Sequence, residues 1–177
     1  MNHLHLNVKN IGYSRPIHTK KGYNMLVNYA GTKPITIVSP IVECPYGVDH
    51  NDGNCTMKLR INDGPFLQLL NDIDDKNADL PDTFNLFSAS SETEKEPFYY
   101  TPFLEDQDAL RVRIPLKNGK RYDVEVHSKN EAIDYNLATV GDIVPGAKLK
   151  CTLEWKHVWI VGRTFGYFWT VREIEIM

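Results

Sequence analysis

The sequence KLKCTLEWKHVWIVGRTFGYFWTVREIEI, residues 148–176, decides the fold. Over 148–155 apolar and polar residues alternate, which is typical of a β-strand with one face in the core. The chain then continues to a turn at Gly162-Arg163 and returns as a final strand. The alternation slips near Lys156-His157 and near Arg172-Glu173. These slips predict β-bulges, which help to bend strands around a barrel.

Similar patterns precede this hairpin along the chain. Residues 12–22 and 43–55 are polar and rich in turn-forming residues, so we expect loops there. The turn at Gly31 predicts a hairpin between its flanking strands, and Asn118-Gly119 is a strong two-residue hairpin signal. Alternation and β-forming composition predict strands at 4–11, 23–30, 35–40, 56–61, 98–104, 109–116 and 121–127.

One segment has helical rather than strand periodicity. Apolar residues recur at helical spacing over 64–75, with Pro65 near the start, and this predicts a helix. Residues 76–97 are polar and acidic and contain two prolines, so we expect a long surface excursion. A short helix is expected within 129–147.

The order of these elements indicates a mainly β fold. Long helices do not alternate with strands, which excludes a parallel α/β fold. We expect one OB-like domain over 1–177, an antiparallel β-barrel with an insertion at about 63–108 that holds the helix and a long acidic loop. A β-sandwich is the alternative.

Composition limits the class of protein. The chain has 177 residues and only three cysteines, without a CxxC pair, which argues against a disulfide framework and a structural zinc site. The N-terminal residues lack the apolar core of a signal peptide, and no apolar run approaches the ~20 residues of a membrane span. We therefore expect an intracellular protein that neither enters nor spans a membrane.

Motifs for catalysis are missing from the sequence. Nucleophile-elbow, zincin, P-loop and dinucleotide-binding patterns do not occur. His3 and His5 share the outward face of a predicted strand, and the spacing of Cys44, His50 and Cys55 fits no standard metal site. We expect no enzyme, no cofactor and no metal. The acidic cluster near Asp74 keeps a metal-dependent nuclease as the weakest alternative.

Charge is distributed unevenly along the chain. The net charge is −3, but Asp63–Asp108 holds twelve acidic residues and two lysines, so the remaining residues sum to +7. Such asymmetry is typical of a basic binding face beside an acidic segment. The alternative without a functional role is a solvated acidic loop that has no partner.

Basic and aromatic residues are interleaved on the predicted strands. Single-stranded nucleic acid needs this combination, because bases stack on rings while Lys and Arg follow the phosphates. Trp155 lies in register with core residues, and Trp159 and Trp169 also favour the core, whereas Phe165 and Tyr167 flank a glycine near a turn and are expected to be exposed. The candidate contacts are Lys20, Lys21, Tyr23, Tyr99, Tyr100, Phe103, Arg111, Arg113, Lys117, Lys120, Arg121, Lys156, Arg163, Phe165 and Tyr167.

The chain resembles the small single-stranded DNA-binding proteins of nucleocytoplasmic large DNA viruses. The resemblance is carried in pieces by GYSRPIHTKKGYNMLVNY, SPIVECPYGV, PFYYTPF and LRVRIPL, and above all by the closing hairpin. In that hairpin Val158-Trp159, Gly162, Phe165-Gly166 and Trp169 match the family pattern. The chain ends VREIEIM and so departs from phage proteins of similar role, which often end in an acidic tail that recruits partners.

The resemblance implies an OB-like fold and sequence-non-specific binding of single-stranded DNA in viral replication, recombination or repair. Viral replication proteins and further copies of the chain are candidate partners, at replication sites in the host cytoplasm or nucleus. The resemblance does not identify the residues that contact DNA. The alternative function is a non-enzymatic β-sandwich that docks a viral partner through its acidic segment.

Overall fold

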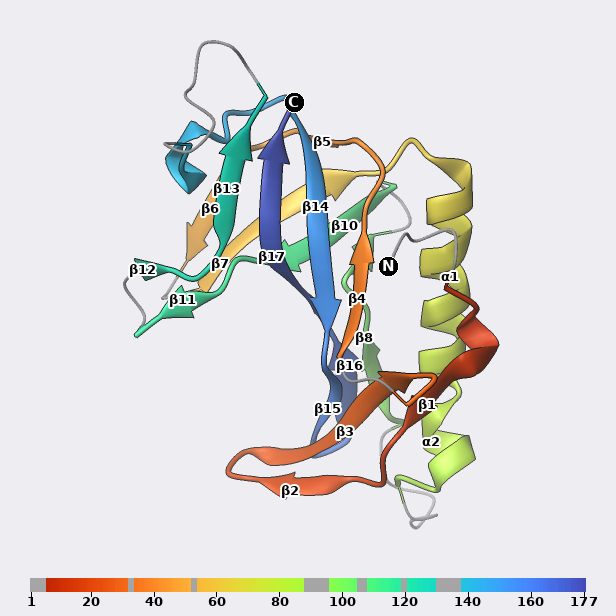
Figure 1. The fold of residues 1–177 in the computed structure, drawn as a ribbon. Coiled ribbons are helices and arrows are strands. Elements are labelled where there is room, and N and C mark those ends of the chain that lie inside the picture. Colours follow the sequence, from red (N-terminus) through yellow and green to blue (C-terminus); the bar gives the residue numbers. More distant parts are fainter. Residues whose placement is uncertain are drawn as a thin grey trace.

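The structure is a computed structural model that describes residues 6–31, 34–51, 54–87, 96–104, 108–118, 121–129 and 138–177. It is mainly β, as predicted, with its strands in several sheets (Figure 1). The candidate Lys120 lies outside the described residues, as do residues 1–5 and 88–95. No helix in the described ranges is long and apolar enough to cross a membrane.

The largest sheet has nine strands. Its hydrogen-bonded pairings form a circuit that runs from β17 through β10, β7, β5 and β14 back to β17. The β10–β17 pairing is parallel, and the other four are antiparallel. The strands are β4 (Ile35–Val38), β5 (Val42–Cys44), β6 (Val48–Asn51), β7 (Asn54–Arg60), β9 (Phe103–Leu104), β10 (Ala109–Arg113), β13 (Glu125–Ser128), β14 (Ala147–Trp155) and β17 (Trp169–Ile176).

A six-stranded sheet lies below the first in Figure 1. The C-terminal hairpin links the two, because β14 is followed by β15 and β16 by β17. In the second sheet β15 pairs with β16 and β3, and β16 pairs with β8. Its strands are β1 (Ile11–Tyr13), β2 (Ile17–Thr19), β3 (Gly22–Tyr29), β8 (Phe98–Tyr100), β15 (His157–Val161) and β16 (Thr164–Tyr167).

Helix α1 (Gly64–Ala78) confirms the predicted helix and extends it. Asp63 caps its N-terminus by accepting a hydrogen bond from the Phe66 N–H at 2.8 Å. Phe66, Leu70 and Ile73 are fully buried on its apolar face. A second helix, α2 (Leu80–Phe84), lies in the segment predicted as an irregular excursion, so that part of the prediction is wrong.

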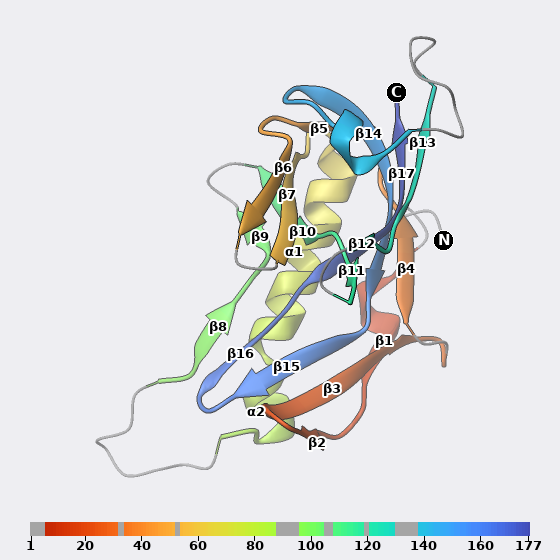
Figure 2. The same ribbon diagram turned by 90° about the vertical axis from the view of Figure 1, so that its left-hand side faces the viewer.

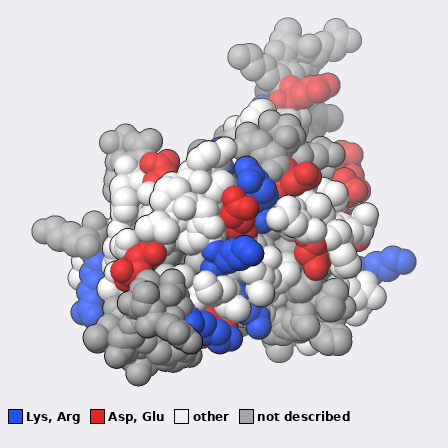
Figure 3. All heavy atoms as spheres, turned by 90° about the horizontal axis from the view of Figure 1, so that it is seen from above, with Lys and Arg blue, Asp and Glu red and all other residues white. Residues whose placement is uncertain are grey.

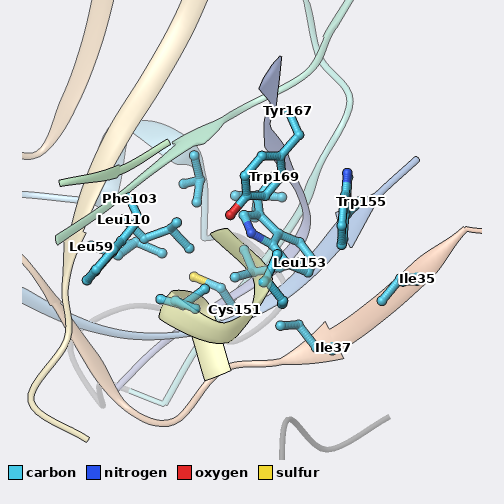
Figure 4. Packing of buried hydrophobic residues seen from close by; sticks show 14 of the residues in the cluster. Ile35, Ile37, Leu59, Phe103, Leu110, Cys151, Leu153, Trp155, Tyr167 and Trp169 are labelled. Carbon is cyan, nitrogen blue, oxygen red and sulfur yellow. The ribbon is translucent and has the colours of Figure 1, made fainter. Parts of the chain in front are cut away.

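The core is rich in aromatic rings from the C-terminal hairpin (Figure 4). Trp155 and Trp169 are fully buried with ring centroids 5.7 Å apart, which confirms their prediction as core residues. Tyr167 packs against Trp155 at 4.9 Å. All three cysteines are buried and unpaired.

Several local predictions differ from the structure. Residues 8–10 form a 3-10 helix instead of a strand. The hairpin at Gly31 is wrong, because β3 pairs in the six-stranded sheet and β4 pairs with β14 in the other. The supposed loops contain strands: β2 lies within 12–22, and the end of β5, all of β6 and the start of β7 lie within 43–55. Of the segment 129–147, in which a short helix is expected, residues 130–137 lie outside the described residues, and the described part contains a 3-10 turn at Val140–Asp142.

The two predicted slips in alternation have different structural causes. At Arg172 the register between β14 and β17 shifts, so this prediction is confirmed. At Lys156 the chain instead passes from β14 to β15 and so changes sheet. The paired strands before and after Asn118-Gly119 have two residues each, β11 (Leu116–Lys117) and β12 (Arg121–Tyr122), and are shorter than expected.

Candidate nucleic-acid interface

An open groove of about 900 Å³ lies on the outer surface of β7 and β10. The turn between β5 and β6 forms one wall, and the end of β8 with Phe168 forms the other. Figure 2 views the molecule from the side that carries β6, β7, β10 and β8. The residues used below are Tyr46, Asp49, Lys58, Tyr100, Arg111, Arg113 and Phe168, all of which line this groove.

Strand alternation places the cations of the groove. On β10, Leu110 and Val112 are fully buried, so Arg111 and Arg113 point outward. On β7 the same alternation turns Lys58 outward, and Lys58 lies directly opposite Arg111. Like charges that face each other across a sheet are destabilising. A bound anion could contact both side chains, because they lie side by side on the same face.

Each described cation of the groove contacts an aromatic side chain. The guanidinium of Arg113 lies 3.6 Å from the centroid of the Phe168 ring, and the Lys58 ammonium lies 5.5 Å from that of Tyr46. The Arg111 Nη1 donates a hydrogen bond to the Tyr100 hydroxyl at 3.2 Å. Stacking on a ring holds a guanidinium in place while its N–H groups stay available to phosphate oxygens.

The charge in the groove is positive although the protein is acidic. Lys58, Arg111 and Arg113 face one carboxylate, Asp49, among the described lining residues. Ion pairs on other parts of the described surface include Arg60–Glu43 at 3.2 Å and Lys129–Glu175 at 3.0 Å. Figure 3 shows one such face, on which Lys and Arg are interspersed with Asp and Glu. The groove therefore differs in sign from the protein as a whole.

Tyr100 is held in the groove by contacts on the other side of its strand. Its neighbours Tyr99 and Thr101 point to Asp74 on α1, and their hydroxyls donate hydrogen bonds to its carboxylate at 2.9 and 2.5 Å. The buried Tyr167 donates a third at 2.8 Å. Burial raises the pKa of Asp74, and the three hydroxyls oppose that rise. α1 thereby fixes the strand that carries Tyr100.

Trp159 extends the row of rings beyond Tyr100. Gly166 lies between them in register and leaves room for the indole to lie flat. A Cβ on Gly166 would lie 3.0 Å from Trp159 Cζ2 and 2.3 Å from the Tyr100 carbonyl oxygen. The two ring centroids are 6.0 Å apart. Trp159 is half-buried and therefore not the core residue that the sequence favoured.

His157 adds a titratable group beside the groove. Its ring packs edge-on against Phe168 with centroids 5.6 Å apart. Burial lowers the pKa of His157, and the positive charges of Lys156 and Arg113 lower it further. The imidazole is therefore neutral at neutral pH and gains a charge only in acid.

The structure brings only some of the predicted contacts together. Tyr100, Arg111 and Arg113 meet in the groove. Lys20, Lys21 and Tyr23 belong to the β2–β3 hairpin, and Lys117 and Arg121 to the β11–β12 hairpin. Lys156 forms an ion pair with Glu154 at 3.2 Å, and Arg163 lies over the Phe87 ring.

Four of the predicted aromatic contacts are corrected. Phe103, Phe165 and Tyr167 are buried, so none of them offers a ring to a ligand. They occupy the sheet faces that pack into the core, and nearby glycines do not expose them. Tyr99 points to Asp74 instead of the groove.

Four groove or near-groove residues were missed: Tyr46, Lys58, Trp159 and Phe168. The alternation over 56–61 would have found Lys58, because it predicts a lysine on the outward face beside a second strand of outward arginines. Tyr46 lies in a segment predicted as a loop, and no local signal marks it. The chain was compared with known proteins: no protein-family model matches it, and no curated protein matches its sequence.

Proposed function

We propose that this protein binds single-stranded DNA, without sequence preference and without chemistry of its own, in the groove on β7 and β10. The observation that carries the proposal is that every described groove cation contacts an aromatic side chain, two of them through the ring and Arg111 through the Tyr100 hydroxyl. Arg111, Arg113 and Lys58 would hold phosphates, while Tyr46 and Tyr100 would stack bases. Stacking accepts any base, because every base has a π-face.

The strand circuit supports an OB-like barrel as part of this proposal. OB-folds are five-stranded barrels that bind oligonucleotides on the face of their second and third strands. In chain order the strands of the circuit are β5, β7, β10, β14 and β17, so β7 and β10 are the second and third. The groove lies on those two strands.

The cellular role in the proposal comes from the viral family that the sequence resembles. Single-stranded DNA is exposed during replication, recombination and repair, and we place the protein in those processes of a large DNA virus inside the host cell. The acidic residues of α1 lie on a different element from the groove cations. This separation leaves the acidic segment available to viral replication proteins while DNA is bound.

Salt titration tests the proposal. The affinity for a fluorescent oligothymidylate is measured by anisotropy over a range of salt concentrations. The three phosphate contacts in the groove are expected to contribute about −2 to the slope of log K against log salt, from about −0.7 per contact. Arg113→Ala is expected to make the slope less negative by about 0.7.

The matched control is Arg60→Ala, an exposed arginine on β7 that pairs with Glu43 outside the groove. It is expected to leave the slope unchanged. Salt-independent binding, or equal affinity for duplex and single strands, would contradict the proposal.

A further inference from the structure

One face of the six-stranded sheet is covered by α1, and the other, here called the open face, carries exposed side chains among the described residues. On the covered face, Tyr99 and Tyr167 bond to Asp74 of α1. In Figure 2 the sheet is seen in front of α1, from the open side. The open face exposes apolar side chains: Phe98 is 65% exposed, and Ile17 and Val161 are each 48% exposed.

A continuous row of residues leads from the groove onto this open face. Registers pair Tyr100 with Gly166, Gly166 with Trp159, Trp159 with Asn24, and Asn24 with Ile17. All five residues therefore lie on the same face of the sheet. Because Tyr100 also bonds to Arg111, the row starts in the groove.

The composition of the open face suits a polyanion with flat bases better than a protein partner. None of the residues in the six strands is acidic, although the chain has 23 acidic residues. The exposed Lys20 and Lys21 lie in the turn between β2 and β3, at the far end of the face. Glu96 precedes β8 and lies outside it.

We propose that the single strand bound in the groove continues across this open face, with Trp159 and Phe98 as stacking platforms and Lys20 and Lys21 beside the outermost phosphates. This inference rests on the proposed function and extends its footprint. From β8 to β2 the face spans four strand spacings, roughly 19 Å at ~4.8 Å each. At ~3.4 Å per stacked nucleotide, this adds about five to six nucleotides to the site.

Tryptophan fluorescence tests the first platform. The chain has three tryptophans, and Trp155 and Trp169 are fully buried, so quenching by stacked bases must come from Trp159. An oligothymidylate of about twenty nucleotides is expected to quench the emission of the wild type, whereas Trp159→Phe is expected to remove most of the change. Binding by anisotropy without quenching would overturn the inference and leave the proposed function intact.

Phe98→Ala tests the second platform with little risk to folding, because the ring is exposed. Its affinity for the same oligonucleotide is expected to fall about five-fold or more, as for the loss of one stacking platform. Tyr23→Ala is the matched control: Tyr23 is 46% exposed but lies on the opposite face of the sheet, in register with Ile160. It is expected to bind like the wild type.

Three results separate the possible failures. Equal affinities for Phe98→Ala and the wild type would overturn the extended footprint. Self-association that Phe98→Ala abolishes, with DNA binding unchanged, would assign the face to a second copy and also overturn it. The absence of any binding to single strands would refute the proposed function itself.

Discussion

Gly166→Ala tests whether close packing between Trp159 and Tyr100 supports the site. The added Cβ would lie 2.3 Å from the Tyr100 carbonyl oxygen and 2.9 Å from the Tyr100 Cβ. The carbonyl belongs to backbone that is paired in the sheet, so it cannot move as a flexible side chain would. Overpacking of this kind costs about 1–3 kcal/mol of the free energy of unfolding.

The expected loss corresponds to about 2–12 °C in Tm for a chain of this size. Thermal unfolding followed by circular dichroism measures it, and anisotropy with oligothymidylate measures the effect on DNA binding. Affinity is expected to fall as well, because β8 must move away from β16 and carry Tyr100 with it.

Gly64→Ala provides the control. A Cβ on Gly64, the first residue of α1, meets no atom within 4 Å, and alanine favours helix. This variant is expected to be as stable as the wild type or slightly more so, with unchanged DNA affinity. Equal Tm and affinity for Gly166→Ala and Gly64→Ala would refute the packing argument.

Three further predictions concern charge and capping. The folded pKa of Asp74 is raised, so the folded state holds its proton more tightly than the unfolded chain, and its contribution to stability is lost as pH rises through the folded pKa. The free energy of unfolding of Asp74→Asn, measured by urea titration and compared with that of the wild type, is therefore expected to improve from about pH 4 to pH 7. A difference between the two proteins that does not change with pH would contradict this. Because the pKa of His157 is lowered, its ring gains a charge beside Arg113 only in acid, and DNA affinity is expected to rise there. His157→Gln is expected to weaken this rise, which anisotropy at several pH values measures. Identical pH profiles for the variant and the wild type would exclude His157 as the source of the rise. Asp63→Ala removes the cap of α1 and is expected to cost about 1 kcal/mol of unfolding free energy with no change in salt slope, while unchanged stability would show that the cap contributes nothing.

Local sequence patterns predicted the strands better than their partners. Alternation located the strands of the C-terminal hairpin and the register shift at Arg172, because both depend on which residues are apolar. The turn at Gly31 was read as a hairpin, yet its flanking strands enter different sheets. A turn signal indicates that the chain reverses, but distant strands decide the pairing.

The same limit explains which contacts could be predicted. Arg111 and Arg113 point outward for a local reason, since the residues between and beside them are apolar. Phe165 and Tyr167 face inward because α1 covers that side of their sheet, and the sequence around them contains no sign of this. Trp159 looks like a core residue in an apolar strand, but it lies on the face of the sheet opposite α1 and is only half-buried.

The burial of all three cysteines makes the protein well suited to site-specific labelling. Burial raises the pKa of Cys44, Cys55 and Cys151, so each keeps its thiol proton at neutral pH and reacts slowly with maleimides. A cysteine introduced by Val161→Cys, at a position 48% exposed on the open face, would stand in solvent as the most reactive thiol of the chain. A dye attached there would report the arrival of a ligand without any native cysteine having to be removed.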